Sequence, residues 1–172
     1  RSVVHRALTG HGDEVIGFEA GFVGLLEGRF RPLDLNSVSG ILARGGTILG
    51  SARLERARLR EAADNADDLC TQYGIDVLIP IGGEGTLTAA RMLADAGMPV
   101  VGVPKTIDND INGTDRTFGF DTAVTVATEA IDRLKTTAES HQRVMVVEGM
   151  GRHAGWIALE AGMAGGAHGI CV

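Results

Sequence analysis

The chain is poor in aromatic side chains, in cysteines and in long apolar runs. Only 4% of its 172 residues are Phe, Trp or Tyr, so the core is predicted to be aliphatic and rich in alanine. Cys70 and Cys171 lie far apart without metal-ligand spacing, which favours a reducing, cytoplasmic setting. No apolar run approaches the ~20 residues of a membrane-spanning helix. A net charge of −6 gives no electrostatic basis for binding nucleic acid.

Two common catalytic motifs are also missing. The chain has no G-x-x-x-x-G-K-[ST] phosphate loop and no G-x-S-x-G nucleophile elbow. Its five histidines show no paired ligand spacing. Without the nucleophile elbow, a serine-hydrolase triad is not supported. Glycine, in contrast, is abundant: 25 residues, roughly 15% against a usual ~7%, gather where apolar runs end and where tight turns or close ligand approach need them.

Apolar strand-like runs alternate with helical patterns along the chain. Strands are predicted at residues 15–18, 77–81, 100–103, 144–147 and 169–172. Helices are predicted at residues 36–44, 55–73, 86–96, 121–138 and 153–163, and the first residues also follow a helical pattern. Strands that are apolar on both faces and separated by single helices indicate a three-layer α/β fold with a mostly parallel sheet.

Residues 82–86, Gly-Gly-Glu-Gly-Thr, follow a predicted strand and open a predicted helix. Backbone N–H groups and the helix dipole favour an anion at such a turn. The third glycine of a dinucleotide fingerprint is replaced by Thr88, and a plain tight turn explains the glycines equally well. Glu84 favours the functional interpretation, because an acid beside an anion needs a cation between them.

Reactive side chains are concentrated at the end of the next strand, in residues 104–110, Pro-Lys-Thr-Ile-Asp-Asn-Asp. A hydrophilic Asx-type turn is the alternative explanation. Asp108 could accept the proton of an attacking hydroxyl while Asp110 holds magnesium directly or through water. Ligands of open α/β sheets bind at the carboxyl ends of strands, so these residue types predict phosphoryl transfer at this edge.

Two arginines flank the predicted strand at 144–147. Arg152 follows Met150 and Gly151 in a glycine turn, and its guanidinium could neutralise developing phosphoryl charge. Taken alone, Arg152 is equally explained as a surface residue before a helix, and Arg143 as a charge at the start of a strand.

Together these motifs resemble the 6-phosphofructokinase family in order and spacing, over essentially the whole chain. The turn 82–86, the loop 104–110 and the segments 141–143 and 150–152 carry the resemblance, and residues 45–53 resemble a further family segment. The resemblance implies phosphoryl transfer from ATP with Mg²⁺ to the 1-hydroxyl of fructose 6-phosphate, giving fructose 1,6-bisphosphate. It also implies a homo-oligomer, a tetramer or a dimer. The net charge and the short apolar runs predict no nucleic-acid or membrane partner.

The resemblance assigns roles to the reacting groups. Asp108 matches the general base, and Thr106 matches a contact to phosphate and transition state. Asp110 matches an acid near substrate and magnesium, and Glu84 matches a metal-associated acid that is usually aspartate. Arg152 matches an arginine that stabilises the transferring phosphoryl group.

Other positions match substrate and nucleotide contacts. Met150 and Gly151 match sugar contacts, and Arg143 matches an arginine that reaches the sugar phosphate of a neighbouring subunit. Nucleotide contacts are implied for Arg53, Gly83, Gly85 and Thr86, with Phe22 as a nearby aromatic.

Two positions bear on the choice of phosphoryl donor, and they favour different donors. Gly85 resembles ATP users, because an aspartate there would repel the α-phosphate, whereas Lys105 resembles pyrophosphate users. We favour ATP, because charge at Gly85 would exclude a nucleotide outright, while a lysine among phosphates suits either donor. A pyrophosphate-dependent phosphofructokinase is the alternative.

The resemblance also predicts an incomplete fragment. Residues 1–119 are expected to form a nucleotide-binding Rossmann-like domain that lacks its first glycine-rich loop. Residues 120–172 are expected to begin a truncated sugar-phosphate-binding α/β domain, so the isolated chain should be inactive. Arg1 matches an effector-binding arginine of the family's allosteric members, but His5 replaces a second one, which argues against bacterial-type effector control.

Two further classes of protein compete with this assignment. A lipid or NAD kinase shares a similar glycine–acid–glycine turn but is not expected to carry Asp108, Asp110 and Arg152 in these contexts. A non-catalytic regulator that binds nucleotide or sugar phosphate would keep Arg53 and Arg152 but would not need Asp108.

Overall fold

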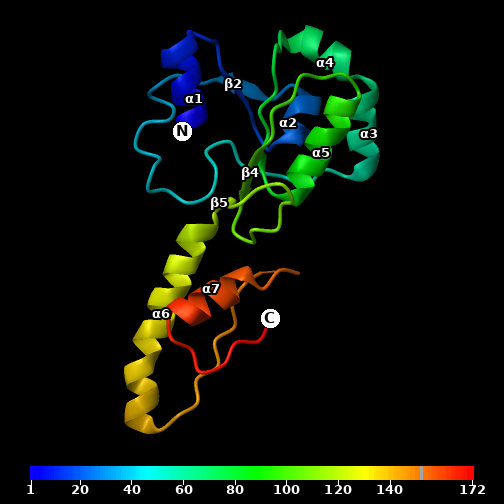
Figure 1. Cartoon of the computed structure of the whole chain (residues 1–172). Coiled ribbons are helices and arrows are strands. Elements are labelled where there is room, and N and C mark those ends of the chain that lie inside the picture. The colour runs from blue at the N-terminus through cyan, green and yellow to red at the C-terminus, as the bar shows by residue number, and fades with distance from the viewer. Residues whose placement is uncertain (152) are drawn as a thin grey trace. The chain divides into compact units, whose positions relative to one another are not determined.

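The computed structural model describes residues 1–151 and 153–172, and the chain divides into two units. The first unit comprises residues 1–78 and 91–100, and the second comprises residues 79–90 and 101–172. Figure 1 labels many of the helices and strands along the chain. The predicted functional domains, 1–119 and 120–172, stay a prediction.

The first unit opens with helical turns and a small antiparallel sheet. Helix α1 (Ser2–Arg6) continues as the π-helical turn η1 (Ala7–His11). Strands β1 (Ile16–Phe18) and β2 (Phe30–Pro32) pair antiparallel, and α2 (Phe22–Glu27) connects them. The predicted strand at 15–18 is thereby confirmed, whereas α2 and β2 were not predicted.

Three helices supply much of the core of the first unit: α3 (Arg56–Asp64), α4 (Ala66–Tyr73) and the end of α5 (Glu84–Asp95). The buried cluster consists of Leu25, Ala62, Ala66, Leu69, Leu93 and Met98. All six are aliphatic or thioether side chains, so the predicted aliphatic core is confirmed here.

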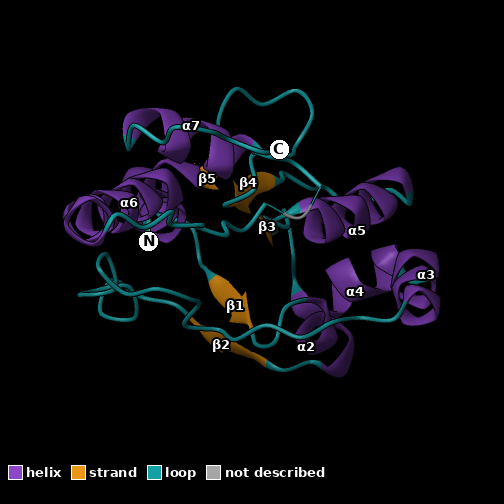
Figure 2. Cartoon of the chain, turned by 90° about the horizontal axis from the view of Figure 1, so that it is seen from below, coloured by secondary structure: helices purple, strands orange, loops and turns teal. Residues whose placement is uncertain are grey.

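The second unit contains a three-stranded parallel sheet in the order β3-β4-β5. It is built from β3 (Ile81–Gly82), β4 (Val103–Thr106) and β5 (Phe118–Gly119). In Figure 2 the strands lie side by side, with α5 following β3 and α6 following β5. Parallel strands place their carboxyl ends at one edge, so the segments after Gly82 and Thr106 leave the sheet together.

Two helices pack against each other after this sheet. They are α6 (Phe120–His141) and α7 (Trp156–Ala164). Gly165 allows the close approach, because a Cβ there would lie 2.8 Å from Ile131 Cγ2. The helix predicted at 121–138 is confirmed. No helix among the described residues is both long enough and apolar enough to cross a membrane.

Two helix predictions in the first unit are wrong in part or in full. Residues 36–44 form turns instead of a helix. Asp34 Oδ1 accepts bonds from the N–H and Oγ of Ser37 (2.7 and 2.6 Å), and Gly40 takes φ +69, so local bonds replace helical ones. The helix predicted at 55–73 is broken at Asn65, whose Nδ2 donates to the Glu61 carbonyl (2.7 Å).

The strands predicted at 77–81 and 100–103 are misplaced. Only an isolated bridge forms at Leu78, opposite Val100, and β3 starts at Ile81. Pro80 has no N–H to donate, so it cannot contribute a full ladder residue between them. On the partner side, β4 begins at Val103 and runs on to Thr106, past the predicted end.

Two predicted strands near the end of the chain are wrong, because neither finds a pairing partner within the described residues. In segment 144–147, Val144 and Val146 are 93% and 92% exposed. Segment 169–172 also remains irregular, and a strand needs a neighbour to satisfy its backbone groups. The helix predicted at 153–163 starts at Trp156, because Ala154 N–H closes a turn onto the Gly151 carbonyl (2.7 Å).

Candidate active site

The glycine turn after β3 lies against the end of β4. A Cβ built on Gly83 would come 3.5 Å from Thr106 Cβ and 3.8 Å from Thr106 Oγ1. Gly82 cannot carry a side chain, since its Cβ would lie 2.6 Å from Thr86 Cβ. Helix α5 begins at Glu84, so its positive N-terminal end stands at this turn. The structure therefore brings together two of the turns that the sequence singled out.

Gly85 faces open space in the first turn of α5. No atom lies within 4 Å of a Cβ built there. Glu84 beside it is exposed, and Lys105 on β4 is exposed as well. The position that the sequence associates with donor choice is thus accessible from solvent.

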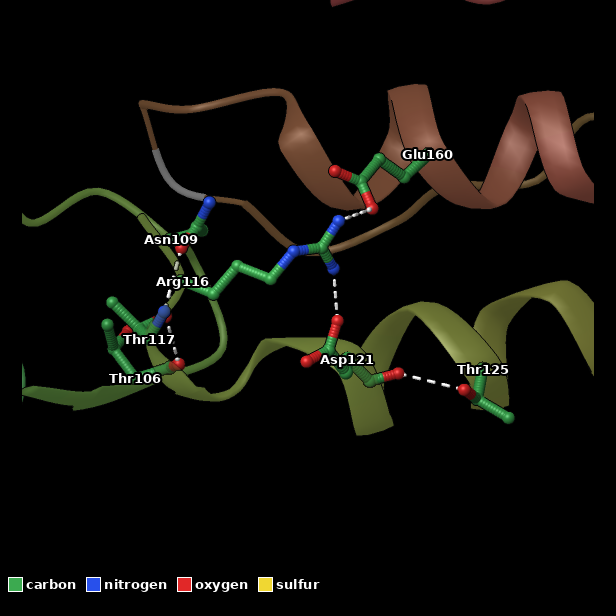
Figure 3. Close-up of polar contacts among 7 residues, drawn as sticks. All are labelled: Thr106, Asn109, Arg116, Thr117, Asp121, Thr125 and Glu160. Carbon is green, nitrogen blue, oxygen red and sulfur yellow. Dashed lines mark hydrogen bonds and ion pairs between the residues drawn. The ribbon is translucent and has the colours of Figure 1, made fainter. Parts of the chain in front are cut away.

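The loop of residues 107–116, called the acid loop below, is tied to the sheet by two threonines and an asparagine (Figure 3). Thr117 Oγ1 donates to the Thr106 carbonyl (2.8 Å), and Thr117 N–H donates to Asn109 Oδ1 (2.9 Å). Asp108 N–H donates to Thr106 Oγ1 (3.2 Å). Asn109 adopts φ +53, a left-handed conformation that asparagine tolerates well.

These bonds bear on the alternative that the acid loop is only an Asx-type turn. Its internal bonds are made by Asn109, Thr106 and Thr117, and the carboxylates of Asp108 and Asp110 take no part in them. Sequence reasoning missed Thr117, which is only 3% exposed. Thr117 directly precedes a strand and belongs to none of the motifs, so nothing in its sequence context pointed to this role.

Asp110 carries an unusual oxygen. Its Oδ1 is buried and has no hydrogen-bond partner within the described residues. A buried carboxylate oxygen without a donor is unfavourable, so the position suits a cation or a donor group from a ligand.

The acids fit a magnesium ion better than a metal held entirely by protein. No cluster of three or more His, Cys, Asp or Glu side chains is placed for a metal among the described residues. Mg²⁺ commonly uses one or two carboxylates and completes its shell with water and phosphate oxygens. Glu84 and Asp110 fit that pattern in number and type.

A pocket of about 410 Å³ opens between the acid loop and α7. Residues 109–116 line one side, and Trp156 and Glu160 of α7 line the other. Arg116 joins these walls: its guanidinium pairs with Asp121 and lies 3.5 Å from Glu160 Oε2 (Figure 3). Sequence reasoning assigned no role to Arg116, because an ion-pair partner as distant along the chain as Glu160 leaves no local pattern.

The third predicted turn lies immediately before α7. Gly151 is required there, because a Cβ would collide with the Ala154 carbonyl oxygen. Met150 is 73% exposed. Arg152 lies outside the described residues, so its predicted role in stabilising the transferring phosphoryl group stays a prediction. Arg143 follows the end of α6, where its N–H donates to the Ala138 carbonyl (2.9 Å).

Two of the remaining predicted contacts, Arg53 and Phe22, belong to the first unit. Arg53 is exposed in the segment before α3, and Phe22 opens α2 and packs against the hydrophobic core. Thr86, by contrast, belongs to the second unit, in the first turn of α5. The nucleotide-contacting role of each stays a prediction.

A parallel sheet with a glycine turn, a helix N-terminus and an acid loop at its carboxyl edge is typical of phosphate-binding α/β proteins. The family model for phosphofructokinase matches residues 1–172 of the chain. The chain belongs to the phosphofructokinase family, as its motifs predicted, and the predicted α/β fold is confirmed with it.

Relatives of both donor types are similar to the chain. An ATP-dependent 6-phosphofructokinase 2 of Streptomyces coelicolor is 81% identical over 172 residues, all of this chain and 50% of that protein. A pyrophosphate–fructose 6-phosphate 1-phosphotransferase of Amycolatopsis methanolica is 58% identical over the same length, again 50% of that protein. The chain thus spans about half the length of the curated relatives it matches.

Solved structures agree with the fold. The phosphofructokinase of Pichia pastoris in the T-state matches with a TM-score of 0.82 and 35% identity, over 95% of this chain and 19% of that one. The Saccharomyces cerevisiae enzyme matches with a TM-score of 0.78 and 34% identity, over 93% of this chain and 25% of that one.

Proposed function

We propose that the protein, as part of a longer polypeptide, transfers the γ-phosphoryl group of ATP to the 1-hydroxyl of fructose 6-phosphate. The products are fructose 1,6-bisphosphate and ADP. The observation that carries the proposal is the acid loop, whose internal bonds leave the carboxylates of Asp108 and Asp110 available, and which follows Thr106, the residue that lies against the Gly83 turn. The 81% identity to an ATP-dependent relative supports it.

Asp108 is the proposed general base. Its carboxylate takes the proton of the 1-hydroxyl as the sugar oxygen forms a bond to the γ-phosphorus and the bond to the leaving ADP oxygen breaks. The Thr106 hydroxyl and the N-terminal end of α5 stabilise the transferring phosphoryl oxygens. Arg152 supplies positive charge to the same oxygens.

Glu84 and Asp110 are the proposed magnesium-associated acids. Bound Mg²⁺ supplies charge neutralisation for the phosphate oxygens. The role of this chain is to hold the two carboxylates at the mouth of the glycine turn and at the buried edge of the acid loop. The unpartnered Oδ1 of Asp110 supports that assignment.

The other predicted contacts complete the proposal. Met150 and Gly151 contact the sugar, and Arg143 reaches the sugar phosphate bound by a neighbouring copy in a homo-oligomer. Arg53, Gly83, Gly85 and Thr86 contact the nucleotide. The enzyme is expected to work in the cytoplasm.

Pyrophosphate is the second candidate donor, supported by Lys105 and by the 58% identical pyrophosphate-dependent relative. Open space at Gly85 favours ATP, because a nucleotide needs room and no negative charge there. The deciding experiment measures fructose 1,6-bisphosphate formation by the full-length enzyme with ATP–Mg and with pyrophosphate–Mg. Turnover with ATP is expected, and turnover with pyrophosphate alone would replace the donor assignment. Turnover with neither would contradict the proposed function.

The variants Gly85→Asp and Gly85→Ala separate charge from space. Neither side chain meets an atom within 4 Å at its Cβ, so both proteins should fold. The aspartate should lower kcat/KM for ATP by about 100-fold or more, because like charges in a binding site repel by several kcal/mol. The alanine should retain most ATP use. Equal losses in both variants would show that charge at this position does not select the donor.

A further inference from the structure

Arg116 connects the acid loop to α6 and to α7 (Figure 3). Its guanidinium pairs with Asp121 in the first turn of α6, and its Nη2 lies 3.5 Å from Glu160 Oε2 on α7. Its Cζ also lies 5.6 Å from the ring centre of Phe120. Arginine suits this position, because its planar fork can contact two carboxylates at once while a lysine offers one point charge.

The partners of Arg116 are firmly anchored. Phe120 is fully buried at the start of α6. Glu160 stands on α7 between Ile157 and Ala161, which are 4% and 2% exposed. Thr117, the next residue after Arg116, is bonded to the end of β4. The guanidinium therefore spans parts of the chain that packing already holds in place.

The position of α7 relative to the acid loop matters for the site. Asp110 and Glu160 line opposite sides of the same pocket. Helix α7 follows the Met150–Gly151 turn almost directly. Any shift of α7 away from the acid loop would therefore change the separation between the acids and the proposed sugar and phosphoryl contacts.

The ion pairs themselves should add little stability. The side chains of Arg116 and Glu160 are 53% and 29% exposed, and ion pairs near solvent contribute about 0–1 kcal/mol. Such a contact can instead fix positions, because a guanidinium held by two carboxylates restricts the movement of both the loop and the helices.

We propose that Arg116 is a positioning residue for phosphoryl transfer, acting through Glu160 to set the acid loop against α7. This inference rests on the proposed function. Arg116 is not assigned a contact to substrate; its effect reaches the reacting groups through the placement of Asp108 and Asp110.

The test compares Arg116→Met, Arg116→Lys, Glu160→Gln and the double variant Arg116→Met/Glu160→Gln in the full-length enzyme. Arg116→Met should lower kcat by about 10–100-fold, the scale of a misplaced catalytic group, with KM for fructose 6-phosphate within about twofold. Glu160→Gln should lower kcat by about threefold, and the double variant should match Arg116→Met. Arg116→Lys should restore less than half of the lost rate.

The matched control is Arg91→Met, which breaks the exposed pair with Asp95 on α5 (2.7 Å) and should leave kcat unchanged. A kcat for Arg116→Met within twofold of wild type would overturn the inference. Losses in the double variant that multiply those of the single variants would also overturn it, because Glu160 would then act independently of Arg116.

Amide hydrogen exchange separates this inference from the proposed function. Exchange across residues 107–117 should speed up in both Arg116→Met and Glu160→Gln, whether or not fructose 6-phosphate is the substrate. If the wild-type enzyme does not phosphorylate fructose 6-phosphate but exchange responds in this way, the loop–helix coupling stands and the proposed function fails. Unchanged exchange in both variants would overturn the coupling itself.

Discussion

The apolar cluster of the first unit and the acid loop of the second are ordered by different kinds of interaction. In the first, six buried apolar side chains form one cluster, and the rings of Phe18, Phe30 and Tyr73 meet edge to face at 5.6–5.7 Å. In the second, the acid loop is held by the hydrogen bonds of Thr117 and the ion pairs of Arg116. The loop that carries proposed reacting groups relies on polar contacts, whereas the cluster of the first unit relies on apolar burial.

The difference follows from what each interaction controls. Apolar burial is favourable whatever the direction of approach, so it stabilises without fixing individual atoms. Hydrogen bonds weaken steeply when distance or angle changes, so they orient the groups that they connect. A loop that must present carboxylates to a reacting phosphorus needs orientation. Changes that disturb the acid loop should therefore affect rate, and changes in the apolar cluster should affect stability.

The largest expected effect is on rate, from Asp108→Ala in the full-length enzyme. Loss of a general base should lower kcat by about 10²–10⁴-fold. The Asp108 carboxylate takes no part in the loop's internal bonds, so the melting temperature and fructose 6-phosphate binding should change little. Steady-state kinetics and a thermal melt on the same sample make the measurement.

Asp95→Ala is the control for Asp108→Ala, because Asp95 is an exposed acid that pairs with Arg91 in its own helix. It should leave kcat unchanged. If Asp108→Ala kept the wild-type rate, Asp108 would lose its assigned role, and the acid loop would no longer distinguish the second unit as the source of catalysis.

The largest stability effect is expected in the first unit, from Leu69→Ala. Leu69 is 7% exposed within the apolar cluster, and truncating a buried leucine typically costs about 2–5 kcal/mol. The kcat of the folded enzyme should stay near wild type. Urea unfolding measures the loss, with Leu42→Ala as control, since Leu42 is 82% exposed. A comparable loss from both variants would refute the assignment of stability to the cluster.

Much of the fold was predictable because it depends on patterns averaged over many residues. The helices at 86–96 and 121–138 and the parallel arrangement follow from apolar periodicity, which one unusual side chain does not disturb. The errors arise where a single side chain decides. Asn65 interrupts a helix by bonding to the Glu61 carbonyl, and Pro80 limits a strand by lacking a donor.

The candidate site divides in the same way. Its acids and glycines could be found from residue type and spacing, because strand ends in a parallel sheet meet at one edge. The residues that hold the acid loop could not. Thr117 and Arg116 act through partners up to 44 residues away, from Arg116 to Glu160, and such contacts depend on the finished tertiary structure.

Thr117→Val tests whether the polar contacts of the second unit orient the acid loop. The variant loses the bond from Oγ1 to the Thr106 carbonyl (2.8 Å) and leaves that carbonyl without this donor, a change that typically costs about 1–3 kcal/mol. We expect kcat to fall as well, because Thr106 loses a restraint. Thr117→Ser should preserve the bond and most of the rate.

Thr125→Val is the matched control for Thr117→Val. Thr125 Oγ1 also donates to a backbone carbonyl, that of Asp121 (2.9 Å), but on the exposed surface of α6 (Figure 3). Its loss should change stability by less than about 0.5 kcal/mol. Equal losses of stability in the two variants would show that the Thr117 bond holds the acid loop no more strongly than the Thr125 bond holds the surface of α6.

The smallest expected effect is a change in thiol reactivity in the first unit. Burial against the apolar cluster, and secondarily the charge of Asp67, raise the pKa of the Cys70 thiol. A raised pKa lowers the thiolate fraction at a given pH, and the thiolate is the form that reacts. Cys70 should therefore label with iodoacetamide at pH 8 several-fold more slowly than a cysteine in a short unstructured peptide.

Mass spectrometry of the Cys70 peptide measures this rate, and Asp67→Asn should raise it modestly by removing the smaller cause. Labelling as fast as in the free peptide would show that water reaches the thiol and that the packing of the first unit is looser than its buried cluster indicates.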